Sequence, residues 1–74
     1  MPSLPVISGD EAVRAFERLG YERVRQRGSY IRLMSDESGR EPLTVPRKKE
    51  LKRRMLRALI RDAGISVEDF MELL

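Results

Sequence analysis

The chain has 74 residues, a formal net charge of +3, and neither cysteine nor histidine. A chain of this length buries only about 60% of the surface that its unfolded form exposes, so a deep, enclosed active site is excluded. The composition also excludes disulfides and thiolate zinc sites, and it removes the side chain most often used for acid–base catalysis. We expect residues 1–74 to form a single domain.

Positive charge is concentrated between Arg23 and Arg61, whereas carboxylates gather near the two ends of the chain. This asymmetry indicates a polyanionic or acidic partner, although a solvated basic face would also explain it. No apolar run is long enough to span a membrane and no signal-peptide pattern opens the chain. These features predict a cytoplasmic protein without a membrane partner.

The first predicted element is a helix over Gly9–Leu19. Ser8 and Glu11 have the spacing of a capping box, and Gly20 can close the helix in a left-handed conformation. The residues expected to face the core are Ala12, Val13, Phe16 and Leu19. Ahead of this helix, residues 1–7 should form an extended lead-in whose apolar side chains pack on the domain edge: Leu4, Val6 and Ile7.

Three short strands are predicted next. In the first, residues 21–26, Val24 should face the helices while Arg23 and Arg25 face the opposite way. A tight connection leads to the second strand, Tyr30–Met34. Its inward residues are expected to be Ile31 and Leu33, and its outward residues Tyr30, Arg32 and Met34. Residues 43–45 form the third strand, and Pro46 suits its end.

The longest amphipathic helix is predicted over residues 50–63, with Gly64 closing it. Its apolar stripe contains Leu51, Met55, Leu56, Leu59, Ile60 and Ala63, and its opposite side carries Arg53, Arg54, Arg57 and Arg61. A short last helix, capped by Ser66, should close over the core with Phe70, Met71, Leu73 and Leu74. The order α-β-β-β-α with a short C-terminal helix predicts a two-layer α+β domain with a three-stranded antiparallel sheet.

Two cationic segments are expected to meet at one end of this sheet. Residues 27–29 open the second strand, and residues 47–49 precede the second helix. Together they would surround a shallow patch with Arg27, Ser29, Tyr30, Lys48, Lys49 and Lys52. Cations neutralise phosphates and an exposed tyrosine ring can stack on an unpaired base, so the patch suits RNA better than a small metabolite.

Each feature of the patch also has a plainer explanation. Most charge runs are solvated faces, Gly28 can serve only the hairpin turn, and a strand tyrosine usually packs on its neighbours. The carboxylates near the following turn, Asp36, Glu37 and Glu41, have no recognisable ligand spacing, and we predict no metal site there. The convergence of the cationic segments, rather than any one of them, favours nucleic-acid binding.

Several motifs in the chain match one known family in order and spacing. They are LPVISG at residues 4–9, LGY at 19–21, RQRGS at 25–29, LTVP at 43–46, KELK at 49–52, LR at 56–57 and IRDAGIS at 60–66. With these motifs over nearly its whole length, the chain resembles the HicA-type toxins of bacterial and archaeal toxin–antitoxin pairs.

The resemblance implies a double-stranded-RNA-binding-like fold and a small endoribonuclease that cleaves messenger RNA without a metal or other cofactor. It also implies a HicB-type antitoxin that covers and silences the toxin. The family's catalytic histidine position is occupied here by Tyr30, and a frequent second histidine position falls at about Lys48. The RNA-binding residues that we expect are Arg27, Gly28, Ser29, Arg32, Arg47, Lys48, Lys49, Lys52 and Arg53.

The missing histidine leaves the activity open. Metal-independent RNA cleavage needs a group that removes the 2′-hydroxyl proton, and a phenol, which ordinarily titrates at about pH 10, is a poor base at neutral pH. Cleavage by Tyr30 with Lys48 or Lys49 steadying the phosphate is one interpretation. The alternative is a non-catalytic RNA-binding or protein-interaction module that kept the scaffold.

Overall fold

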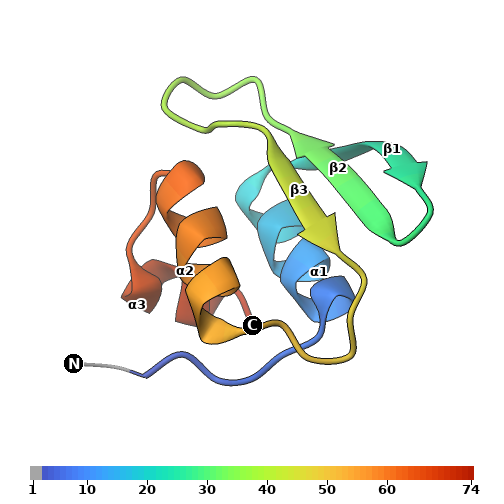
Figure 1. The fold of residues 1–74 in the computed structure, drawn as a ribbon. Coiled ribbons are helices and arrows are strands. Elements are labelled where there is room, and N and C mark those ends of the chain that lie inside the picture. The colour runs from blue at the N-terminus through green and yellow to red at the C-terminus, as the bar shows by residue number, and fades with distance from the viewer. Residues whose placement is uncertain (1–2) are drawn as a thin grey trace.

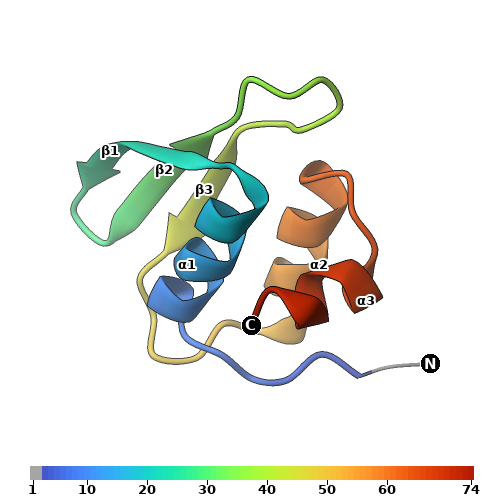
Figure 2. The same cartoon turned by 180° about the vertical axis from the view of Figure 1, so that it is seen from behind.

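The computed structural model describes residues 3–74, and Met1 and Pro2 of the expected lead-in lie outside this range. The elements in it are α1 (Gly9–Leu19), β1 (Glu22–Arg27), β2 (Tyr30–Met34), β3 (Leu43–Pro46), α2 (Arg53–Asp62) and α3 (Val67–Glu72). The strands form one antiparallel sheet in the order β1-β2-β3. Helices α1 and α2 lie on one side of this sheet, and α3 packs beside α2 (Figures 1 and 2). The predicted α+β fold is confirmed.

Helix α1 has the predicted ends. The Glu11 N–H donates to Ser8 Oγ at 3.0 Å, and the Ser8 N–H donates to Glu11 Oε1 at 2.9 Å, which completes the capping box. The hydrogen bonds from Ser8 lower the pKa of the Glu11 carboxyl. Gly20 ends the helix with a φ of 118°, a left-handed conformation that glycine adopts without steric cost.

Strand β1 departs from the predicted alternation. Arg23 pairs with Leu33 and Arg25 pairs with Arg32, so Val24 is an extra residue in a β-bulge. Before the bulge, the Arg23 Nε lies 3.2 Å from Glu17 Oε2 of α1, on the helix side of the sheet. Val24 is 52% exposed. The predictions that Val24 faces the helices and that Arg23 faces away are therefore wrong, because strict alternation fails at a bulge.

The other two strands keep the predicted faces. In β2, Ile31 and Leu33 are buried while Tyr30, Arg32 and Met34 are exposed. Strand β3 runs one residue further than expected and includes Pro46, which pairs with Tyr30. Proline fits here because β3 is an edge strand, where a missing N–H costs no hydrogen bond within the sheet.

Helix α2 begins at Arg53 rather than near residue 50. The Leu51 N–H donates to the Ile7 carbonyl at 2.7 Å, and the Gly9 N–H donates to the Lys48 carbonyl at 2.8 Å. Residues 48–51 are therefore bonded to the N-terminal segment and not to a helix. Leu51 is buried, but it belongs to this irregular segment and not to α2, although its spacing in the sequence fits a helix. Met55, which was also predicted on the apolar stripe, is 42% exposed.

The core lies between the sheet and the helices. Phe16 of α1 is fully buried, and its ring centroid lies 5.8 Å from that of Tyr21 and 5.1 Å from that of Phe70 of α3. Tyr21 is also buried, and its hydroxyl donates to the Glu41 carbonyl at 2.7 Å. Burial raises the pKa of this phenol, because the ionised form loses hydration.

The two ends of the chain pack less completely than predicted. Leu4 and Ile7 are buried, but Val6 is 49% exposed. Leu74 is 46% exposed because it lies beyond the end of α3 at Glu72. None of the helices within residues 3–74 has the length and apolar character that crossing a membrane requires.

Candidate nucleic-acid interface

The turn before β2 and the segment before α2 meet at one end of the sheet. The Arg47 N–H donates to the Ser29 carbonyl at 2.6 Å. Tyr30 pairs with Pro46, so the first residue of β2 lies opposite the last residue of β3. The structure thus brings the two cationic segments together, as the sequence predicted.

The turn itself is a two-residue hairpin loop, Gly28 and Ser29, between the paired residues Arg27 and Tyr30. Gly28 has a φ of 58°, whereas no residue other than glycine has a positive φ among the described residues. A positive φ at the first loop position alone is the requirement of a type II′ turn, and glycine meets it. Gly28 therefore has a structural role, and it directs Tyr30 into β2 at the rim of the sheet.

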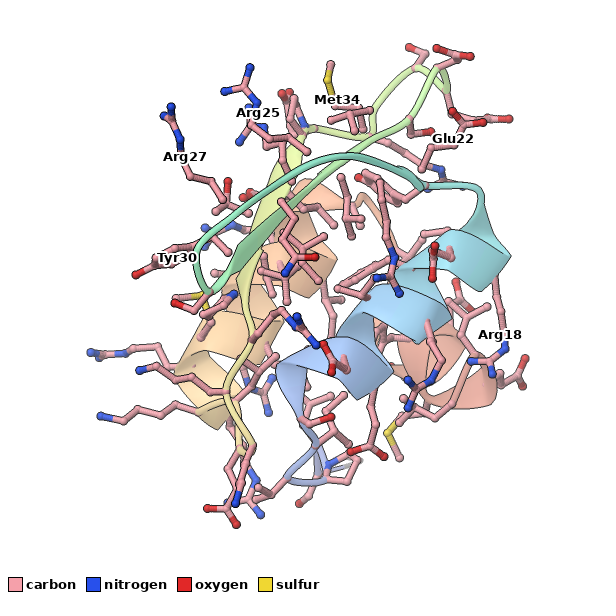
Figure 3. The ribbon with its side chains drawn as sticks, turned by 90° about the vertical axis from the view of Figure 1, so that its right-hand side faces the viewer. Arg18, Glu22, Arg25, Arg27, Tyr30 and Met34 are labelled. Carbon is pink, nitrogen blue, oxygen red and sulfur yellow. The ribbon has the colours of Figure 1, made fainter. Side chains whose placement is uncertain are left out.

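Tyr30 lies on the outer face of the sheet, which carries no helix, and is 53% exposed. Figure 3 shows Tyr30 extending outward from the start of β2, with Arg25 and Arg27 reaching into solvent from β1. A shallow hollow on this face is lined by Val24, Arg25, Arg27, Tyr30, Arg32, Met34 and Thr44. Three guanidinium groups around an aromatic ring can pair with phosphates and stack on bases.

Four residues of this hollow were not predicted: Val24, Arg25, Met34 and Thr44. Val24 was missed because the bulge in β1 has no clear sequence signal. Thr44 faces Arg32 in the register of β2 and β3, and the Arg32 Nη1 donates to its Oγ1 at 2.8 Å. Pairing the outward residues of neighbouring strands would have found Met34 and Thr44, because outward residues of one sheet share a face.

Arg47, a predicted RNA-binding residue, is paired with Asp10 in the first turn of α1. Its Nε lies 3.0 Å from Asp10 Oδ1 and its Nη2 lies 3.2 Å from Oδ2. The hydrogen bond from Arg47 lowers the pKa of the Asp10 carboxyl, and the same contact raises the pKa of the guanidinium. The charge of Arg47 is thus compensated within the chain, and the pair holds the end of β3 against α1.

The lysines that follow are differently placed. Lys48, Lys49 and Lys52 are exposed and form no ion pair within residues 3–74. The backbone around them is nevertheless fixed, by the bonds of Lys48 and Leu51 to the N-terminal segment. These side chains therefore present uncompensated positive charge from an ordered backbone, next to the turn that carries Tyr30.

Arg53 is anchored elsewhere, since its Nε donates to the Leu4 carbonyl at 2.7 Å. It ties the first turn of α2 to the N-terminal segment. Of the residues predicted to bind RNA, Arg47 and Arg53 are thus engaged in structural contacts, whereas Arg27 and the three lysines are free of side-chain hydrogen bonds to the described residues.

Gly9 makes the close approach of α1 to β3 possible. A Cβ at this position would collide with the Pro46 carbonyl oxygen, and Gly9 is buried. From the sequence, Gly9 was predicted only to begin the first helix. Nothing in a single sequence distinguishes a glycine required for close packing from one that merely follows a cap.

Within residues 3–74, no three aspartate, glutamate, histidine or cysteine side chains gather closely enough to hold a metal ion. Asp36 and Glu37 lie in the loop between β2 and β3, and the Glu37 N–H donates to Ser35 Oγ at 3.1 Å. Both side chains are exposed to solvent, as expected for polar residues of a connecting loop.

Comparison with known proteins gives one family. No curated protein matches the chain. A family model described as "HicA toxin of bacterial toxin-antitoxin" matches residues 9–65, which include α1, the whole sheet and α2. Both segments that meet beside Tyr30 lie inside the match. The chain therefore belongs to the HicA toxin family of bacterial toxin–antitoxin systems.

Proposed function

We propose that this chain is a toxin that binds messenger RNA through the surface where its two cationic segments meet. This basic surface consists of Arg27, Gly28, Ser29, Tyr30, Arg32, Lys48, Lys49 and Lys52. The observation that carries the proposal is the hydrogen bond from the Arg47 N–H to the Ser29 carbonyl, which joins the segments beside an exposed aromatic ring. Membership of the HicA family supports a toxin with an RNA target.

The chemistry of the basic surface fits an unpaired strand. The three lysines have no carboxylate partner within the described residues. They can therefore neutralise RNA phosphates, and the counterions condensed on the RNA are released. The exposed ring of Tyr30 offers a stacking platform, which is worth roughly 1–3 kcal/mol per base. In a duplex the bases are stacked on one another and the ring would find no free face.

Strand cleavage has weaker support than binding. No hydrogen bond joins the Tyr30 hydroxyl to any described residue, and the chain contains no histidine. A general base must be positioned to accept the proton of the 2′-hydroxyl, and no described side chain orients the Tyr30 hydroxyl for this role. We therefore propose binding as the main activity of the surface, with cleavage by Tyr30 slow at most.

An assay with three proteins and two oligonucleotides distinguishes RNA cleavage from RNA binding. Wild type, Tyr30→Phe and Tyr30→His are each incubated with a labelled single-stranded RNA and with its 2′-deoxy counterpart. We expect all three to bind the RNA at low salt, and only Tyr30→His to cleave it, leaving the 2′-deoxy strand intact. Cleavage by wild type but not by Tyr30→Phe would make the chain an active nuclease, and absence of RNA binding would overturn the proposal.

We further propose that a HicB-like antitoxin protein covers the basic surface. Family membership supports a partner of this kind. The test is co-expression with the protein encoded in the neighbouring reading frame, followed by RNA binding measured for the purified complex. The complex should fail to bind RNA that the free chain binds. A complex that still binds RNA with unchanged affinity would show that the partner docks elsewhere.

A further inference from the structure

A second basic area lies on the far side of the molecule from the β1–β2 hairpin. Arg54, Arg57 and Arg61 of α2 border a shallow hollow with Ala58, Ile65 and Val67, where the chain passes from α2 into α3. Figures 1 and 2 both show α2, α3 and their connection on the side away from β1 and β2. We call these six residues the α2 arginine face.

The charges of this face are not used by the fold. Neither Arg54 nor Arg57 forms an ion pair or a side-chain hydrogen bond within residues 3–74. Arg61 approaches only its neighbour Asp62, at 3.7 Å, and its side chain is 78% exposed. By contrast, Arg23 and Arg47 each pair with a carboxylate of α1. The row of arginines on α2 is therefore available to a partner.

The surroundings of the row suit a protein better than RNA. The aromatic side chains Phe16, Tyr21 and Phe70 are buried and Tyr30 belongs to the outer face of the sheet, so no described ring on the arginine face can stack on a base. The floor contains Ile65 and Val67, both half-buried, which attract apolar side chains and not phosphates. A binding surface that combines an apolar floor with a rim of one charge is typical of helix-in-groove recognition.

The spacing of the arginines matches a helix. Positions 54, 57 and 61 follow one another at three and four residues, so they lie on one side of α2 over about 10 Å. Carboxylates at the same spacing on a second helix, packed alongside α2, can face all three guanidinium groups. An apolar residue between those carboxylates can then enter the hollow beside Ile65 and Val67.

We propose that the α2 arginine face binds an acidic amphipathic helix of a partner protein. Carboxylates of that helix pair with Arg54, Arg57 and Arg61, and its apolar stripe covers the hollow. The inference does not depend on RNA binding, because the face shares no residue with the basic surface. A helix bound here leaves Tyr30 uncovered.

The test uses the full chain and a labelled synthetic peptide that carries a leucine stripe flanked by glutamates at three- and four-residue spacing. A second peptide has glutamine at every glutamate position. Binding is measured by fluorescence anisotropy at low salt for wild type, for Arg54→Glu/Arg57→Glu, and for the matched control Arg25→Glu/Arg27→Glu. We expect the acidic peptide to bind wild type and the control equally, and to bind the Arg54→Glu/Arg57→Glu variant roughly tenfold more weakly or worse.

The glutamine peptide should lose affinity for wild type to a similar extent. Amide NMR shifts should change along α2 and at the start of α3 and stay constant at Tyr30. Thermal unfolding checks that each variant folds, and Arg54→Gln/Arg57→Gln supplies a milder change if charge reversal destabilises α2. The proposal is overturned if the acidic peptide does not bind, if both peptides bind alike, or if the α2 variants lose RNA affinity instead of peptide affinity.

Discussion

The Arg47 N–H donates to the Ser29 carbonyl at 2.6 Å, while the Arg47 guanidinium holds the Asp10 carboxylate. One residue therefore links the turn before Tyr30 to the first turn of α1. The placement of Tyr30 depends on this link as well as on the strand register. Arg47 thus helps to build the basic surface, whereas the exposed lysines beside it are free to contact a ligand.

The ion pair between Asp10 and Arg47 should contribute to stability in a pH-dependent way. The hydrogen bond from Arg47 holds the pKa of the Asp10 carboxyl below its ordinary value in the folded chain. A depressed carboxyl pKa stabilises the fold above the unfolded value, and this contribution is lost as pH falls through the folded value. Asp10→Asn should therefore lower the free energy of unfolding at neutral pH. On acidification to about pH 3, the free energy of unfolding of this variant should fall less than that of wild type.

Urea denaturation at both pH values measures this difference. Glu17→Gln, which removes the exposed partner of Arg23 in the same helix, is the control and should leave the response of Asp10 to acid in place. Parallel stability curves for wild type and Asp10→Asn would contradict the assignment.

The three lysines should account for much of the salt dependence of RNA binding. Lys48→Gln/Lys49→Gln/Lys52→Gln removes three phosphate partners, and each contact with a single strand contributes about 0.7 to the slope of log Kobs against log salt. The slope should therefore fall in magnitude by about 2. Filter binding or anisotropy over a salt series measures it.

The matched control is Arg54→Gln/Arg57→Gln/Arg61→Gln, which removes the same charge from the far side of the molecule. It should leave the RNA slope nearly unchanged. Equal losses in the two triple variants would mean that net charge, and not the basic surface, governs binding.

Gly9→Ala should destabilise the fold more than a helix-start substitution usually does. The added Cβ would meet the Pro46 carbonyl, so α1 and β3 must separate, at a cost of about 2 kcal/mol or more. Gly20→Ala is the comparison, since no atom lies within 4 Å of its Cβ position and only its φ of +118° is unfavourable, which costs about 1 kcal/mol. Denaturant unfolding of both variants tests the order, and a larger loss for Gly20→Ala would contradict it.

Tyr21→Phe should remove the bond from the hydroxyl to the Glu41 carbonyl and lower the free energy of unfolding by about 1 kcal/mol at neutral pH. Burial raises the pKa of Tyr21, so its contribution is complete below the unfolded pKa and is lost as pH rises through the folded value. Wild type should consequently lose more stability than Tyr21→Phe above about pH 10. Phenolate absorbance checks the titration, and identical alkaline stability profiles would refute the assignment.

The sequence predicted the features that local chemistry determines. The capping box of Ser8 and Glu11, the closing Gly20 and the alternation of β2 follow from short-range geometry, and all are present. The meeting of the two cationic segments also followed, because an antiparallel sheet returns every second strand to the same end.

The features that were missed depend on contacts distant in sequence. The bulge at Val24 reverses the predicted orientation of Arg23 and Val24 and leaves Arg25 on the outer face. The hydrogen bond between the Leu51 N–H and the Ile7 carbonyl keeps residues 48–51 out of α2. Likewise, Arg47 was predicted to be a free cation, but it pairs with Asp10, which lies 37 positions earlier in the chain. Composition and periodicity do not reveal contacts between residues that are distant in sequence. For this reason Arg47 was predicted to bind RNA, whereas in the structure it pairs with Asp10.

Strand β1 forms an open edge of the sheet, and every residue in it is exposed. An unpaired edge can recruit a strand of a second molecule and start intermolecular aggregation. Here the edge carries Glu22, Arg23, Arg25 and Arg27, and the bulge at Val24 interrupts its regular spacing of N–H and carbonyl groups. We therefore expect the bulge and these charges to oppose strand-by-strand polymerisation in concentrated solutions of this small protein.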